Sequence, residues 1–247
     1  MWAAPAVPSS RPVAVGPVGV LRTMGVPVTQ NASITNEREP LVPPVPASPS
    51  GGEADEAKLQ LHRQRMMFGL AEAIREKGLA QTQITDIVRH AGASRRTFYR
   101  CFPDKESCFI ALAESLYTMA RSEVESAVDS TADPEEQVNQ AVDVFLAILA
   151  ADPVLVSAFK NDLPMLGERG VRIQRESLDR YVEMLVRLTS TPIMREAGIG
   201  PVQYEVALML MAGFDGVVGN AIAQGESVVD LAPLMKDLFR RVLVPVD

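Results

Sequence analysis

Apolar residues recur at intervals of three and four along most of the chain after Glu56, which is the periodicity of amphipathic helices. In the first predicted helix, Leu70 and Ile74 share the buried face, and Gly78 is placed to end it. A short helix follows and ends at Gly92. Since no stretch alternates apolar and polar residues as a half-buried strand would, the pattern predicts an all-α protein.

The next two helices are marked by their ends. Ser94 is placed to cap a third helix that turns Phe98 inward, and Phe102 closes this helix before Pro103. Asp104 is placed to cap a fourth helix, whose apolar residues between positions 109 and 116 have helical spacing. The short third helix thus has a residue that favours a helix start on one side, Ser94, and one that ends helices on the other, Pro103.

The second half of the chain repeats the helical pattern with fewer motifs. Asp133, Pro134 and Glu136 form a start signature, with a capping residue, a proline in the first turn and a capping-box acid. Apolar spacing predicts another helix around 178–185 and a last one from about Asp230. A long helical body therefore follows the short helices.

Residues 1–50 show neither helical nor strand periodicity, and 10 prolines interrupt them. We expect three parts: a disordered arm at 1–54, a helix-turn-helix domain at 55–107 and a helical domain at 108–247. A signal peptide would need a basic start and an uninterrupted apolar stretch, and neither is present in this arm.

The charge is divided unevenly between these parts. The chain has a net charge of −7, yet residues 56–107 carry 10 Lys and Arg against 6 Asp and Glu. Residues 108–247 carry 11 Lys and Arg against 21 Asp and Glu. A basic module joined to an acidic body suits a protein that turns one face toward phosphate groups.

The segment from Thr82 to Lys105 carries the most informative pattern. Two short amphipathic helices are joined by Ala-Gly-Ala-Ser, in which the glycine permits a tight turn and the serine caps the second helix. The second helix has Arg95, Arg96 and Arg100 on its outer face, and arginine side chains bind guanine edges in the major groove. Hydroxyls on the same helix, at positions 97 and 99, suit phosphate oxygens.

Over residues 60–113 the chain resembles the tetracycline-repressor (TetR) family, through the combination AGxSxxTFYxxFxxKE that begins at Ala91. The resemblance implies a homodimer whose second helix reads duplex DNA. The chain departs from the family's usual pattern at Gln83, Ala93 and Cys101. The alternative is a helical hairpin with a solvated basic face. The predicted DNA contacts, from pattern and resemblance together, are Thr82, Gln83, Ser94, Arg95, Arg96, Thr97, Tyr99, Arg100 and Lys105.

The segment 204–223 is apolar on nearly every side, with Asp215 and Asn220 as the main exceptions. Such a helix is buried all round or lies in a membrane, and a central acid disfavours the membrane. We expect a dimer interface in which this helix and the last one pack against their mates in a four-helix bundle, although an ordinary monomer core stays open. The predicted interface residues are Ala212, Gly216, Gly219, Asn220, Ala223, Leu234 and Leu238.

Aromatic and methionine residues gather in the middle helices. Such residues most often fill a core, but they also line cavities for largely apolar ligands. By the family resemblance we expect a small-molecule effector to bind among them. The predicted pocket residues are Tyr117, Phe145, Phe159, Tyr181, Met184, Phe214 and Asp215.

The two cysteines, Cys101 and Cys108, leave a redox switch open, but buried and inert thiols are favoured, and the chain is expected in the cytoplasm. With two histidines and no Ser/His/Asp set, the sequence predicts neither an enzyme nor a cofactor or metal site.

The sequence therefore predicts a dimeric transcriptional regulator, by family tendency a repressor, that a largely apolar molecule releases from a near-palindromic operator. Two alternatives stay open: a ligand-independent architectural DNA-binding protein, and a small-molecule carrier with a vestigial helix-turn-helix.

Overall fold

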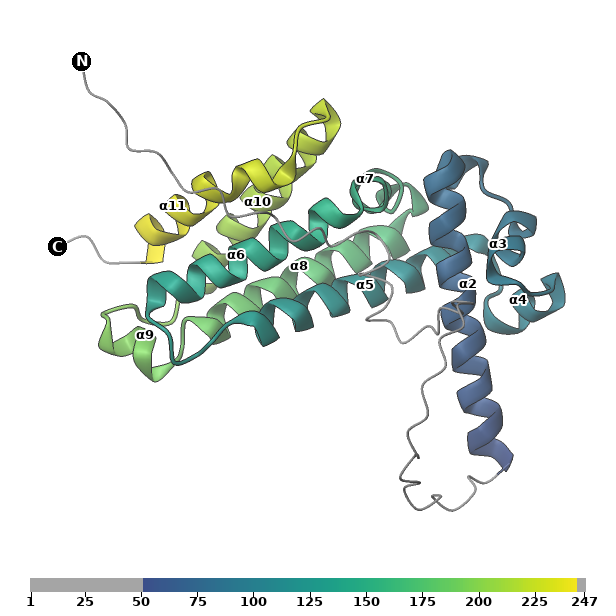
Figure 1. Cartoon of the computed structure of the whole chain (residues 1–247), viewed down its shortest axis with the longest axis horizontal. Helices are drawn as coiled ribbons and strands as arrows, with labels where there is room; N and C mark the ends of the chain where they lie inside the picture. The colour runs from purple at the N-terminus through teal and green to yellow at the C-terminus, as the bar shows by residue number, and fades with distance from the viewer. Residues whose placement is uncertain (1–50, 244–247) are drawn as a thin grey trace, which may run out of the picture.

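The structure, a computed structural model, describes residues 51–243 and side chains from Asp55 onward (Figure 1). The prediction of disorder for the arm concerns residues almost all outside this range. Within the described range every regular element is helical, which confirms the all-α prediction. The elements are α2 (Gly51–Gln81), α3 (Ile84–Ala91), α4 (Arg95–Cys101), α5 (Lys105–Ala127), α6 (Pro134–Ala151), α7 (Pro153–Asn161), η1 (Pro164–Leu166), α8 (Glu168–Leu188), α9 (Pro192–Glu196), α10 (Tyr204–Gln224), η2 (Val228–Leu231) and α11 (Ala232–Leu243).

The first helices form a small unit at one end of the molecule. Helix α2 stands across the end of the long body helices, and α3 and α4 lie on its far side (Figure 1). Their shared core contains Leu70, Ile74 and Phe98, all fully buried or nearly so. Phe109 of α5 belongs to the same core, so α5 connects this unit directly to the body.

Gly78 interrupts α2 where the sequence predicts the helix to end. This glycine has φ 76° and ψ 162°, which breaks the helix, and one more helical turn reaches Gln81. A residue with a side chain would be strained at this φ, so glycine is the residue that allows the break. The extra turn carries Leu79 into the core and places the buried Thr82 hydroxyl against the carbonyl of Gly78.

In the body, α5, α6 and α8 run side by side, and α10 and α11 cover one side of them (Figure 1). Leu146, Val182, Phe214 and Met235 meet in its core. The chain turns by 89° between α6 and the segment Pro153–Leu166. That turn directs α7 toward α2, which places the body against the first unit.

The predicted capping residues do what the sequence indicates. Ser94, Asp104 and Asp133 each accept a hydrogen bond from a backbone N–H in the first turn of their helix. The last helix begins at Ala232 rather than near Asp230, because a short 3-10 turn precedes it. Helices α7 and α9 were not predicted, although a proline stands at the first position of each.

Candidate DNA interface and ligand cavity

The turn between α3 and α4 is built by three local hydrogen bonds. Gly92 lies in the left-handed region, at φ 57° and ψ 44°, and its N–H donates to the carbonyl of Arg89. The N–H of Ala93 donates to the carbonyl of Val88. Ser94 Oγ then accepts from the N–H of Thr97 at 3.1 Å, which starts α4. The glycine and serine of the sequence motif therefore set the angle between the two helices.

Two arginines of α2 that the sequence did not single out brace the helix-turn-helix: Arg65 contacts the turn, and Arg63 contacts the end of α4. Arg65 donates to the carbonyl oxygens of Ala91 at 2.8 Å and Gly92 at 3.1 Å. The guanidinium of Arg63 lies 4.2 Å from the centre of the Phe102 ring and donates to the carbonyl of Cys101. Their only signal in the sequence is a pair of basic residues on the first helix, which a solvated face would also show.

The outer face of α4 is left free. Phe98 is fully buried, whereas Tyr99 is 53% exposed and Arg95, Arg96 and Arg100 are exposed. Among the residues that the structure describes, these three arginines form no salt bridge. Thr97 Oγ1 and Ser94 Oγ are 2.9 Å apart. Three exposed guanidinium groups on a fixed helix form a surface that suits nucleic acid.

Two predicted phosphate contacts have internal roles. Thr82 is 2% exposed and its hydroxyl donates to the carbonyl of Gly78 at 2.8 Å, so this hydroxyl does not face solvent. Lys105 Nζ donates to the carbonyls of Leu79 at 2.9 Å and Thr82 at 3.0 Å. An ammonium has three donors, so one donor of Lys105 remains for a phosphate.

Gln83 stands at the exposed N-terminus of α3. Its backbone N–H donates to Asp86 Oδ2 at 2.8 Å. The same carboxylate lies 2.6 Å from the ammonium of Lys77 on α2. The hydrogen bond from Lys77 is the main cause that lowers the pKa of Asp86, followed by the bond from Gln83. These contacts fix the start of α3 and leave the Gln83 side chain exposed at the helix end.

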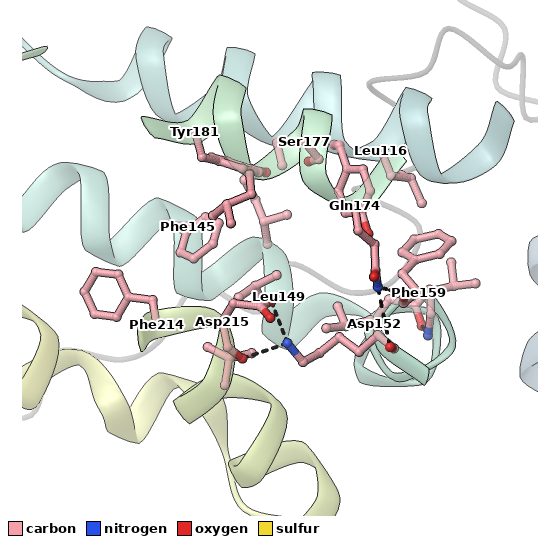
Figure 2. Close-up of a pocket in the computed structure, with 18 of the residues that line it drawn as sticks. Leu116, Phe145, Leu149, Asp152, Phe159, Gln174, Ser177, Tyr181, Phe214 and Asp215 are labelled. Atoms are coloured by element: carbon pink, nitrogen blue, oxygen red, sulfur yellow. Dashed lines mark hydrogen bonds and ion pairs between the residues drawn. The ribbon is translucent and has the colours of Figure 1, made fainter. Parts of the chain in front are cut away.

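A cavity of about 730 Å³ lies in the body (Figure 2). Helices α5, α6, α7, α8 and α10 all contribute to its wall, and so does Arg75 of α2. The structure brings to this cavity six of the seven predicted pocket residues: Tyr117, Phe145, Phe159, Tyr181, Phe214 and Asp215. Met184 is the exception, because it packs in the core beside Leu185. Most of the wall is apolar, as the predicted aromatic residues suggest.

Two ion pairs interrupt this apolar wall. Lys160 Nζ lies 2.5 Å from Asp215 Oδ1 and 2.7 Å from the Asp215 carbonyl oxygen, and Figure 2 marks both bonds by dashed lines at Asp215. Arg75 donates to Asp152 Oδ2 from Nε at 2.8 Å and from Nη2 at 2.6 Å. Asp215 is therefore an exposed partner of a lysine, not a buried partner of an arginine.

The Asp152 pair joins the two parts of the molecule. Asp152 ends α6 and caps α7 by accepting from the N–H of Leu155 at 3.1 Å. Its partner Arg75 belongs to α2 and also pairs with Glu72. One carboxylate thus connects a cavity wall to the helix that supports α3 and α4.

Of the cavity tyrosines, Tyr181 is buried and Tyr117 is partly buried, and desolvation by burial is the main cause that raises the pKa of both. The Tyr181 ring packs edge-on against Phe145, with ring centres 5.7 Å apart. Gln174 Nε2 donates to the carbonyl of Phe159 at 3.0 Å. The tyrosines are neutral at physiological pH and can orient a ligand by hydrogen bonds.

An apolar face of α10 and α11 is exposed. Met209 is 72% exposed, and Leu234 and Leu238 are exposed. On α10 the small or polar residues Ala212, Gly216, Asn220 and Ala223 are exposed as well, and the first two also line the cavity. Gly219 belongs to a different side, because it contacts Lys160. Within the described residues, α10 is long and apolar enough to span a membrane, with a mean hydropathy of 1.7. Helix α6 and the segment Pro153–Leu166 meet at a bend of 89°, and they would count as a second span only if the bent pair were one span.

The two thiols are buried and form no disulfide. Burial is the main cause that raises the pKa of Cys101 and of Cys108, which disfavours the reactive thiolate. Residues 51–243 hold no group of three or more His, Cys, Asp and Glu arranged to bind a metal ion.

Comparison with known proteins identifies the first unit. Residues 69–112 match the family described as bacterial regulatory proteins, tetR family. The chain is 31% identical over 113 residues to the HTH-type transcriptional regulator EthR of Mycolicibacterium smegmatis, covering 45% of this chain and 48% of that protein. It is 33% identical over 70 residues to the uncharacterized regulator YvdT of Bacillus subtilis, covering 28% and 36%. The matches thus span less than half the length of these relatives.

Solved structures share the fold over most of the chain. FadR from Bacillus subtilis, in complex with stearoyl-CoA, has a TM-score of 0.61 at 20% identity and covers 74% of this chain and 98% of its own. FadR from Thermus thermophilus, in complex with lauroyl-CoA, has a TM-score of 0.58 at 19% identity, covering 75% and 96%. A TetR-family regulator from Mesorhizobium loti has a TM-score of 0.63 at 20% identity, covering 75% and 98%.

Proposed function

Because its helix-turn-helix domain belongs to the tetR family of bacterial regulatory proteins, we propose that this chain is a dimeric, DNA-binding transcriptional repressor whose body binds an amphipathic effector. The observation that carries the proposal is the pairing of two features in one chain. A fixed helix presents free arginines, and an apolar cavity lies behind it, connected through Arg75 and Asp152.

The DNA contacts are assigned from exposure. Arg95, Arg96 and Arg100 point outward from α4, and Tyr99 lies exposed on the same helix. We assign Arg96 to a base edge and Tyr99 to a phosphate. Lys105 is assigned to a phosphate through its remaining donor, while the Thr82 hydroxyl is dropped from the set because it is buried.

The dimer is assigned to the apolar face of α10 and α11. Met209, Leu234 and Leu238 on this face are exposed in the single chain, and a second copy would remove them from water. The small residues Ala212 and Gly216 allow close helix approach. Two recognition helices about 34 Å apart would then read the half-sites of a near-palindrome.

The effector class follows from the cavity wall. A volume of about 730 Å³ with mostly apolar lining suits a long hydrocarbon group. Two structures of the same fold hold stearoyl-CoA and lauroyl-CoA, which supports an amphipathic ligand with a long chain. Ligand binding would favour one arrangement of α5, α7 and α2, and would thereby change the separation of the two recognition helices.

The cavity and the exposed arginines of α4 also argue against the two alternative functions, an architectural protein and a carrier. A ligand-independent architectural protein has no use for a cavity of this size. A carrier with a vestigial helix-turn-helix has no use for exposed arginines on α4 that lack acidic partners within the described residues.

Selection of bound sequences from a random duplex library tests the DNA part of the proposal. We expect the purified full chain to enrich a near-palindrome at moderate salt. If correctly folded protein enriches no sequence even at low salt, the assignment as a sequence-specific regulator is wrong, and the carrier function gains weight.

A further inference from the structure

We infer that Lys160 anchors the anionic group of the effector, and that Asp215 holds this lysine until such a group replaces it. The inference rests on the proposed function for the existence of a cavity ligand and goes beyond it in naming the ligand's charge and the residue that recognises it. Both side chains line the cavity, and they lie 2.5 Å apart.

The position of Lys160 is prepared by the helix opposite. Lys160 belongs to the last turn of α7, and its side chain crosses α10 at Gly219. A Cβ at position 219 would lie 2.4 Å from Lys160 Cε, so any larger residue would push the lysine aside. The absence of a side chain at Gly219 therefore fixes where the ammonium meets the cavity.

The two partners of this ion pair differ in their access to water. The Lys160 side chain is 20% exposed, whereas that of Asp215 is 72% exposed. If the pair opens, the Asp215 carboxylate is hydrated at little cost, whereas the Lys160 side chain is the less hydrated partner and gains more from another anion that reaches it from the cavity. Replacement of Asp215 by a ligand carboxylate or phosphate satisfies both groups.

The other cations of the cavity are less suited to this exchange. Arg75 is bound by both Glu72 and Asp152, and Asp152 also caps α7, so an anion that displaced it would uncap that helix. Arg175 is exposed and therefore already hydrated, which weakens any pair that it forms. Lys160 is the cation whose present partner is easiest to replace.

The rest of the wall defines the remainder of the ligand. In Figure 2, Phe145, Tyr181 and Phe214 lie toward one side of the cavity, and Asp215 lies on the wall beside them. An unbranched hydrocarbon chain that ends in one anionic group matches this arrangement. The ligand class is therefore a fatty acid or another acyl compound with an acidic head.

Calorimetric titration of the full chain with decanoate and with decanol tests the inference, because the two probes share a chain length and differ in charge at pH 7.5. We expect decanoate to bind about tenfold more tightly. Lys160→Met should remove this preference and leave decanol affinity within twofold. Asp215→Asn should raise decanoate affinity severalfold, because the competing carboxylate is gone.

Lys160→Arg serves as the matched control, since it retains the charge and should retain the preference, and unfolding midpoints check that each variant is folded. Equal binding of both probes by the wild type and by all variants would overturn the anion anchor while leaving a ligand-binding body intact. Binding of neither probe would contradict this inference together with the effector part of the proposed function, while the library selection judges the DNA part independently.

Discussion

The helix-turn-helix unit and the ligand cavity are held together in different ways. In the first, contacts between residues close in sequence fix the turn: Gly92 bonds back to Arg89, and Ser94 caps Thr97. In the second, the polar contacts join residues far apart: Lys160 meets Asp215, and Arg75 meets Asp152. The turn is formed by local bonds and is braced by Arg65 of α2, whereas the polar groups of the cavity wall depend on distant pairs that a ligand can exchange.

The largest effect should come from the core of the helix-turn-helix unit. Phe98→Ala removes a fully buried ring from the centre of α2, α3, α4 and α5. We expect it to lower the free energy of unfolding by about 3–5 kcal/mol and to abolish DNA binding. Urea unfolding measures the first and fluorescence anisotropy with a duplex the second. Tyr99→Ala is the matched control on the exposed side of the same helix, and a similar stability loss there would show that the local packing is assigned wrongly.

The second-largest effect should come from the Arg75–Asp152 ion pair, which connects the helix-turn-helix unit to the cavity. Arg75→Met leaves Asp152 without its cation in a partly buried place. We expect a loss of about 2 kcal/mol in the free energy of unfolding, together with a weaker effect of effector on DNA affinity. Arg172→Met, at an exposed pair with Glu176 of 3.7 Å, should change stability by less than about 0.5 kcal/mol. Equal losses in the two variants would mean that the Arg75 pair has no special role.

Within the proposed DNA interface, substitutions at a base contact and at a phosphate contact should have different effects on operator and random duplex. Arg96→Ala should cost about 1–3 kcal/mol on the selected operator and little on random duplex, which relaxes base preference. Lys105→Ala should weaken both duplexes alike and lower the salt slope by about one. Because Lys105 also ties α5 to Leu79 and Thr82, its variant should unfold at a lower urea concentration as well. Equal losses on both duplexes for Arg96→Ala would refute its assignment to a base.

The smallest effect should come from the cysteines. The raised pKa of Cys108 means that its thiolate is scarce below pH 9, and burial blocks access to it. We expect iodoacetamide at pH 8 to label the folded chain at least tenfold more slowly than the urea-unfolded chain, and operator affinity to change less than twofold. Rapid labelling with loss of DNA binding would support the redox-switch hypothesis instead.

The same difference between local and distant contacts explains what could be predicted from the sequence. The caps at Ser94, Asp104 and Asp133 and the turn at Gly92 are local, so their spacing was sufficient to predict them. Aromatic residues on the inner faces of five body helices pointed to the cavity, because apolar faces of neighbouring helices must meet.

Other features depended on residues that only the fold brings together. Nothing in the sequence pairs Lys160 with Asp215, which are 55 positions apart, or Arg75 with Asp152, which are 77 apart. The buried place of Thr82 depends on the extra turn after Gly78, and Met184 lies in the core because α8 turns it away from the cavity. The spacing of apolar residues could not resolve which side of α8 faces the cavity.

If occupancy of the body cavity controls DNA binding, operator affinity must differ with and without lauroyl-CoA. The full chain and its selected duplex are titrated by fluorescence anisotropy at one fixed salt concentration. We predict that saturating lauroyl-CoA weakens operator binding at least tenfold and leaves binding to random duplex nearly unchanged. Unchanged operator affinity, in a sample where calorimetry shows lauroyl-CoA bound to the protein, would contradict the account.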